Sequence, residues 1–260
     1  MADVIDRARA AVTDRAELPG MSLMEHLEEL RKRLVHSAIA LVIGLCVAYF
    51  FKEQLYGIVQ APLDQLHVAL NFTHPTDGLN LYLKTAFFGG AILTSPFILY
   101  QVWLFISPGL YKHEKRYIVP FMGATIGLFF GGAYFAYHFV FPGLLKVLII
   151  GFGARFHPII TIDEYTSFFL SVILGIGITF ELPILVFFLA LFGIVDAGLL
   201  WRNSRYAVLI IFVIAAIICP APDPFTMCIF ALPMLILFFV SILIAYMVHP
   251  KRRKAKEIAS

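Results

Sequence analysis

Charged residues are scarce in this sequence: Asp, Glu, Lys and Arg make up only 14% of its 260 residues. Soluble domains carry about 25% charged residues. Hydrophobic residue types account for 60% of the chain, and its mean hydropathy is +0.87. This deficit of charge excludes an ordinary soluble domain and predicts an integral membrane protein.

Cysteine is also rare, and its spacing excludes the usual metal sites. Cys46, Cys219 and Cys228 lie in or beside apolar runs, which is typical of small buried hydrophobic residues. No basic face lies outside the segments that flank these runs, which argues against a nucleic-acid partner. Residues 1–20 contain no apolar core and do not resemble a signal peptide, so we expect a mobile cytosolic tail there.

Long apolar runs dominate the rest of the chain. A helix needs about 20 residues to cross a hydrocarbon core of about 30 Å, and four of the six runs reach that length. The fifth, "YAVLIIFVIAAIIC", is shorter and is followed at once by "PAPDP". Runs five and six are therefore predicted to form a hairpin whose tip lies below the membrane surface or thins the bilayer locally. The predicted spans are 34–51, 84–106, 117–141, 163–193, 206–219 and 225–248.

Lysine and arginine are unevenly distributed between these spans. If the N-terminus is inside, sixteen of the twenty Lys and Arg residues fall in inside segments. The positive-inside rule therefore predicts that both termini are cytoplasmic. The long outer loops, 52–83 and 142–162, are expected to form short caps over the outer face. The predicted organisation is a tail at 1–20, a six-span membrane domain at 21–250 and a basic cytosolic tail at 251–260.

A charged segment, "SLMEHLEELRKRL" at 22–34, leads into the first span. It opens with the S-x-x-E spacing of a capping box, and its apolar residues recur at helical spacing. Glu28 with Lys32 and Glu29 with Arg33 are predicted to form ion pairs one helical turn apart. By spacing alone, the segment is a charged helix at the membrane surface.

The second inside loop, "FISPGLYKHEKRY" at 105–117, contains a single acid, Glu114. Basic residues are expected in an inside loop, so Glu114 is the residue whose presence there needs an explanation. On spacing alone it forms an ion pair with Lys112 or Arg116.

Glu181 stands near the middle of the fourth predicted span, in "ITFELPILVFFLALF". A carboxylate at that depth costs about 2.5–3.5 kcal/mol on insertion scales and is by default a functional-site hypothesis. Pro183 removes one backbone hydrogen bond nearby. The small residues Ser167, Ser171, Gly175 and Thr179 recur every fourth position, which favours close helix packing. The alternative to a functional site is a protonated Glu181 whose hydrogen bonds are made within the helix bundle.

Other polar groups are missing from the predicted spans, where only Glu181 is ionisable and well inside. A solute channel or transporter is expected to line its path with several polar groups. A serine protease needs a Ser–His pair and a haem protein needs paired histidines, and neither pattern is present. The sequence therefore predicts no enzyme and no cofactor. A proton-coupled small-solute transporter that uses Glu181 stays open as the alternative function.

Four segments together resemble one family. They are "HLEELRKRL" (26–34), "SPFILYQVWLFISPGLYKHEKR" (95–116), "TFELPI" (179–184) and "CPAPDPFTM" (219–227). In order and spacing they are similar to TatC, the receptor subunit of the twin-arginine protein translocase. The resemblance implies an all-α integral membrane protein with six transmembrane helices in a curved, glove-like half-shell that has a concave face, and with both termini in the cytoplasm. It also implies location in the bacterial inner membrane.

The family resemblance further implies a function and partners. Such a protein binds twin-arginine signal peptides of folded cargo, recruits the single-span proteins TatA and TatB, self-associates in a larger complex and works with the proton-motive force. Residues that match the family's signal-peptide site are Glu29, Glu114, Phe105, Arg31 and Arg33. Residues that match its outer-loop motifs are Pro62 and Asp223, and Glu181 matches the acid that the family places on its concave face. We expect a neutral Glu181 to be a docking point for a partner helix.

Overall fold

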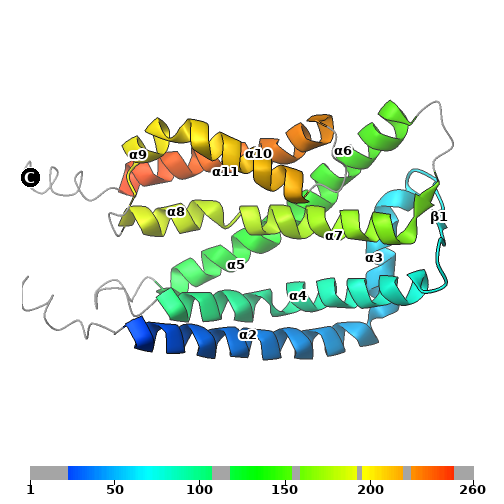
Figure 1. Ribbon diagram of the computed structural model, residues 1–260, viewed down its shortest axis with the longest axis horizontal. Helices are drawn as coiled ribbons and strands as arrows, with labels where there is room; N and C mark the ends of the chain where they lie inside the picture. The colour runs from blue at the N-terminus through cyan, green and yellow to red at the C-terminus, as the bar shows by residue number, and fades with distance from the viewer. Residues whose placement is uncertain (1–22, 107–117, 154–158, 192–194, 219–223, 249–260) are drawn as a thin grey trace, which may run out of the picture.

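The computed structural model describes residues 23–106, 118–153, 159–191, 195–218 and 224–248. The described part is built almost entirely of helices (Figure 1). Its long helices run side by side, while α5 crosses them obliquely and α3 lies across one end (Figure 1). The helices are α2 (Leu23–Phe50), α3 (Lys52–Asp64), α4 (Asp77–Ile106), α5 (Ile118–Phe135), α6 (Phe141–Leu145), α7 (Ile162–Thr179), α8 (Leu182–Leu191), α9 (Ala197–Arg202), α10 (Ser204–Ile218) and α11 (Pro224–Val248), with two π-helical segments, η3 (Ala136–Val140) and η4 (Lys146–Phe152).

Each of the six predicted spans coincides with a helix or helical run. Among the described residues, five runs are long and apolar enough to cross a membrane, and the helix at Ser204–Ile217 is shorter, as the sequence predicted. The first span is longer than expected, because α2 begins at Leu23 and includes the charged segment without a break. The membrane-surface helix and the first span are thus one continuous helix.

The third predicted span, 117–141, ends too early. The helical run continues from α5 through η3, α6 and η4 to Phe152. Pro142 cannot donate a backbone hydrogen bond, and it lies in the first turn of α6, directly after the π-helical segment η3. The chain therefore passes the proline without leaving the helix. His138, close to the end of the predicted span 117–141, consequently lies in the middle of this run.

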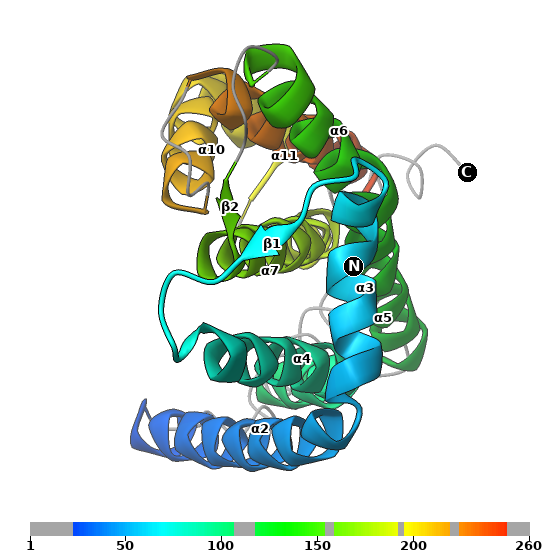
Figure 2. The same ribbon diagram turned by 90° about the vertical axis from the view of Figure 1, so that its right-hand side faces the viewer.

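The first predicted outer loop forms a short cap, whereas residues 142–152 of the second continue the third helical run. Helix α3 covers the ends of α4 and α7, and two short strands, β1 (Leu70–Asn71) and β2 (Ile160–Thr161), pair in parallel beside it (Figure 2). Leu70 is opposite Ile160 and Asn71 is opposite Thr161. The strands join the two loops that the sequence treated separately.

The buried core lies where α3, α4, η3, α6, α7, α10 and α11 meet. Phe169 on α7 is fully buried at its centre, with the rings of Phe88, Tyr137 and Phe141 at centroid distances of 5.6, 6.1 and 5.0 Å. All three contacts are edge-on, the geometry that aromatic pairs prefer. The hydroxyl of Tyr165 donates to the carbonyl of Val59 (2.8 Å) and ties α7 to the cap.

The helices follow an open curve and do not close into a ring. When the molecule is seen along its helices, α2 lies at one extreme, α4 and α7 follow, and α10 and α11 lie at the other extreme (Figure 2). Helix α2 packs along α4, where Gly44 and Gly90 let the two backbones approach. This arrangement agrees with the predicted half-shell.

Candidate functional site

The first turns of α2 hold a carboxylate in a fixed place beside α4. Arg33 lies one turn after Glu29, and its Nε donates to Glu29 Oε1 (2.7 Å) while Nη2 contacts the same oxygen. Arg33 Nη1 also donates to Gln101 Oε1 on α4 (3.2 Å). Both members of the ion pair are about one-fifth exposed. The predicted Glu29–Arg33 pair is confirmed, and it leaves Glu29 reachable from solvent.

The end of α4 completes this site with an aromatic ring. Phe105 stacks on His26 of α2, with ring centroids 4.4 Å apart and planes 21° from parallel. Gln101 and Phe105 are four residues apart and therefore lie on one face of α4. That face meets the first turns of α2 at two points, through Gln101 with Arg33 and through Phe105 with His26.

Sequence reasoning did not single out Gln101. Its side chain is buried in an otherwise apolar helix. A buried amide requires a hydrogen-bond partner, and here the guanidinium of Arg33 supplies it. The signal was present, because Gln101 is the polar residue within the quoted motif "ILYQVW".

Other predicted residues behave differently. Arg31 is exposed on α2. The predicted ion pair between Glu28 and Lys32 is wrong: within residues 23–106 these two exposed side chains do not meet, which is usual for long side chains surrounded by water. Glu114 with its possible partners Lys112 and Arg116, and also Asp223, lie outside the described residues.

Pro62 lies inside α3 and is buried. A proline cannot donate to the carbonyl four residues earlier, which here is the carbonyl of Ile58. The hydroxyl of Tyr137 donates to that oxygen instead (3.0 Å). Pro62 thereby frees an acceptor that ties the cap to the third helical run.

Glu181 lies at a break between α7 and α8. The Phe180 and Glu181 N–H groups still donate to Ile176 and Ile178, but the helix ends at Thr179 and begins again at Leu182. Pro183 then falls in the first turn of α8, where a missing N–H costs nothing. The span predicted at 163–193 is thus present as one apolar run, Ile162–Leu191, with this break inside it.

The break is packed against α5 by small residues. Gly132 on α5 leaves the space that the Phe180 ring fills, since a Cβ there would lie 2.6 Å from that ring. Gly177 similarly faces Phe129 of α5. Glu181 itself is partly exposed, yet its Oε1 atom is buried and makes no hydrogen bond with any described residue. A buried polar atom without a partner is costly, and an incoming donor would remove that cost.

The small-residue face of α7 also carries polar contacts. Lys84 on α4 donates to Asp163 (2.6 Å) and to Ser167 (2.8 Å) on α7. Thr179, the last member of the pattern, bonds back to the Gly175 carbonyl (2.7 Å). Lys84 and Asp163 are the first residues of the predicted spans 84–106 and 163–193, so this ion pair lies near the span ends.

Comparison with known proteins gives one consistent result. A family model described as Sec-independent protein translocase protein (TatC) matches residues 25–233. The protein of that name from Koribacter versatilis (strain Ellin345) is 52% identical over 97% of this chain and 96% of its own length. The one from Aquifex aeolicus (strain VF5) is 40% identical over 92% of this chain and 99% of its own length.

A solved structure agrees with these relatives. The crystal structure described as that of the twin arginine translocase receptor TatC matches with a TM-score of 0.79 and 40% identity, over 85% of this chain and 98% of the other. The match supports the helical half-shell, and a protein translocase family is not an enzyme family. This chain belongs to the TatC family of Sec-independent protein translocase proteins.

Proposed function

We propose that this protein is the receptor subunit of a twin-arginine translocase and that it binds the signal peptides of folded cargo. The observation that carries the proposal is the convergence of Glu29, Arg33, Gln101 and Phe105 from two helices at one end of the molecule. The similar solved protein is described as a twin arginine translocase receptor, which supports the same function. A translocase family favours this function over the solute transporter considered above.

Glu29 would act by exchanging one arginine for another. In the free protein its carboxylate is held by Arg33. An arginine of the signal peptide presents the same planar fork and can take over the carboxylate, whereas lysine is a compact point charge. Arg33 remains held by Gln101 during the exchange. Glu114 is proposed to receive the second arginine, and Arg31 to tune the local charge.

Phe105 would add apolar contact to this electrostatic recognition. A solvent-exposed ion pair contributes only about 0–1 kcal/mol, so two of them alone bind weakly. The stack of Phe105 on His26 provides a surface on which the arginine stems or the signal's apolar segment can pack. We therefore expect binding to need both the arginine pair and the apolar segment.

Photo-crosslinking in membranes tests the signal-peptide site. A photoreactive residue at Leu30 is offered a signal peptide with Arg-Arg or with Lys-Lys. Crosslinking is expected to require Arg-Arg and to fall by up to about fivefold in Glu29→Ala, as the loss of one paired charge predicts. Glu28→Ala is the matched control, because Glu28 is exposed on the same turn. Equal labelling by the two peptides would contradict the proposal.

Glu181 is proposed as the docking point for a single-span partner of the TatA or TatB type. Its buried, unpartnered Oε1 atom supports this role, since a polar side chain on an incoming helix could bond to it. Glu181→Ala is expected to weaken co-purification of these partners and to leave signal-peptide crosslinking unchanged. Glu181→Gln keeps hydrogen-bonding capacity and is expected to retain most of the partner.

Glu164→Ala, at the other end of α7, is the control for the partner experiment. Co-purification that is unchanged in Glu181→Ala would overturn the docking role without affecting the proposal for the signal-peptide site.

The location, topology and domain organisation predicted from the sequence are also proposals. We place the protein in the bacterial inner membrane with both termini in the cytoplasm, and we assign the 21–250 segment as its functional membrane domain, which self-associates in a larger complex.

A further inference from the structure

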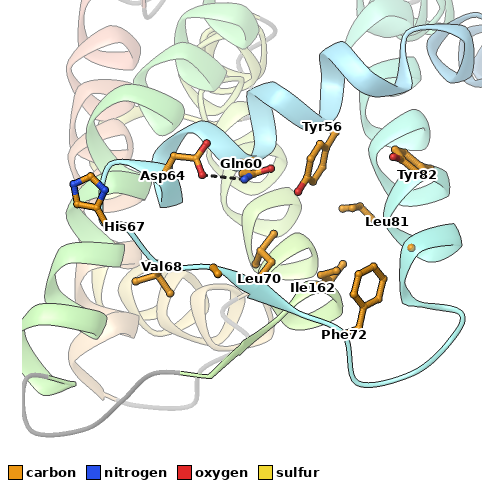
Figure 3. A pocket seen from close by; sticks show the side chains of 12 residues that line it. Tyr56, Gln60, Asp64, His67, Val68, Leu70, Phe72, Leu81, Tyr82 and Ile162 are labelled. Atoms are coloured by element: carbon orange, nitrogen blue, oxygen red, sulfur yellow. Dashed lines mark hydrogen bonds between the residues drawn. The ribbon is translucent and has the colours of Figure 1, made fainter.

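A second polar feature lies at the opposite end of the helices from Glu29. An open pocket of about 770 Å³ is bounded by α3, by the chain that leads into β1, and by the first turns of α4 and α7 (Figure 3). Tyr56, Gln60 and Asp64 line it from α3, and Tyr82 lines it from α4. Leu70 and Phe72 line it from the strand side (Figure 3). The pocket therefore has a polar wall and an apolar wall.

The polar wall favours a cation. Gln60 Nε2 donates to Asp64 Oδ1 (2.9 Å) and fixes this carboxylate, whose Oδ2 atom has no hydrogen bond with any described residue. No lysine or arginine is among the residues that line the pocket, all of which are described. The rings of Tyr56 and Tyr82 lie 6.4 Å apart. Asp64 and the two rings line the same pocket, and a carboxylate combined with aromatic rings can recognise an ammonium group.

The electrostatic environment of Tyr56 agrees with this preference. Burial raises the pKa of its hydroxyl, and the negative charges of Asp64 and Glu53 raise it further. A field that opposes the loss of a proton at this position also attracts a cation to it. Asp64 is on the last turn of α3 and exposed, so an incoming group can reach it without unfolding the cap.

The surroundings specify what carries the ammonium group. Helix α3 lies across one end of the long helices (Figure 2). Because those helices are long and apolar enough to cross a membrane, we place the pocket at the level of the lipid headgroups. Lys52 Nζ is 4.9 Å from the centroid of the Tyr82 ring, so a positive charge flanks the pocket. An ammonium group, a nearby anionic group and an apolar portion are the three parts of a zwitterionic phospholipid. We infer that this pocket binds a phospholipid whose headgroup carries a primary ammonium.

The ammonium would donate hydrogen bonds to Asp64 and face the two tyrosine rings. The phosphate would lie toward Lys52, and the lipid's glycerol and acyl portions would lie along Leu70 and Phe72. A primary ammonium is favoured over a quaternary one because Asp64 and Gln60 offer oxygen acceptors, which a trimethylammonium group cannot use. Such a lipid would join α3 to the β1 segment and stabilise the cap.

Native mass spectrometry of the whole protein tests this inference. The purified protein is incubated with equimolar phosphatidylethanolamine, phosphatidylcholine and phosphatidylglycerol of identical acyl chains. Phosphatidylethanolamine is expected to be retained preferentially. Asp64→Asn is expected to lower that retention about tenfold, as the loss of a charge-assisted hydrogen bond predicts. Glu164→Gln removes the same charge at the same end of the molecule and is expected to have no effect.

A second variant separates loss of charge from loss of space. Ala69→Phe fills the pocket without changing any charge and is expected to reduce retention as Asp64→Asn does. An excess of water-soluble glycerophosphoethanolamine should compete only weakly, because it lacks the acyl chains. Efficient competition would instead identify a soluble amine as the ligand and overturn the lipid assignment. Equal retention of the three lipids, or no change in Asp64→Asn, would overturn the ammonium site altogether.

Discussion

Helix α2 and the α7–α8 pair are both long and apolar, yet they have opposite places in the molecule. In the most apolar stretch of α2 only 11% of residues are buried, against 50% in the stretch that spans α7 and α8. Helix α2 packs on α4 and leaves Leu34 and Val42 exposed, whereas α7 contacts α4, α5 and α11. Apolarity in a membrane protein thus indicates contact with lipid as readily as contact with the core.

This difference in burial places the proposed signal-peptide site on an exposed helix and the proposed docking point, Glu181, in a packed helix pair. The charged beginning of α2 is largely exposed, which the proposed binding of a peptide requires. Glu181 instead lies in the most heavily packed helix pair, where its buried oxygen has no partner among the described residues. Changes in α7 should therefore affect stability first, and changes in α2 should affect binding first. The following predictions test that division.

The largest effect is expected for Phe169→Ala. Phe169 is fully buried in α7 among three other rings, and truncating such a residue costs about 3–5 kcal/mol. The matched control is Phe50→Ala on α2, whose side chain is 85% exposed and should change the stability by less than about 0.5 kcal/mol. Reversible unfolding in mixed detergent micelles measures both. Similar losses in the two variants would show that α2 is packed as tightly as α7.

An intermediate effect is expected where α2 meets α4. A Cβ at Gly90 would lie 2.6 Å from the Leu45 backbone nitrogen and 2.8 Å from the Gly44 carbonyl carbon, so Gly90→Ala must push the helices apart. Overpacking of this kind costs about 1–3 kcal/mol. Gly127→Ala on α5 has open space around it and is expected to be neutral.

The Gly90→Ala variant also sharpens the comparison of the two regions. Separation of α2 from α4 should break the Arg33–Gln101 hydrogen bond and reduce Arg-Arg crosslinking at Leu30, while partner docking at Glu181 persists. Unchanged unfolding and unchanged crosslinking in this variant would contradict the close helix contact. The same two measurements on Gly127→Ala give the baseline.

Much of this division could be predicted from the sequence, because apolar runs and charge positions follow from local composition. The six spans, the short fifth helix and the Glu29–Arg33 pair depend only on residues near one another. The family motifs added Phe105 to the same site. The sequence also predicted correctly that Glu181 lies within an apolar run long enough to cross a membrane.

Contacts between distant segments could not be predicted. The Arg33–Gln101 hydrogen bond joins residues 68 positions apart, and the parallel pairing of Leu70 with Ile160 joins two separate loops. The passage of the chain through Pro142 depends on a π-helical segment, which has no pattern in a hydrophobicity profile. In each case the feature depends on how the chain is arranged in three dimensions, and neighbouring residues in the sequence do not reveal that arrangement.

The smallest effect is expected for the ion pair between α7 and α4, the helix on which α2 packs. Lys84 on α4 bonds to Asp163 on α7, and their side chains are 35% and 46% exposed. Exposure screens the attraction, so the coupling energy from a double-mutant cycle with Lys84→Met and Asp163→Asn should be about 0.2–1 kcal/mol. Unfolding in mixed micelles measures all four proteins.

The size of that coupling decides how independent the two regions are. A small coupling means that α4 is held against α7 mainly by packing, such as the contact of Phe88 with Phe169, so binding at α2 and docking at Glu181 can vary separately. A coupling well above 1 kcal/mol would mean that Lys84 is effectively desolvated by the membrane. In that case loss of the pair should also alter peptide crosslinking at Leu30, because α4 carries Gln101 and Phe105 against α2.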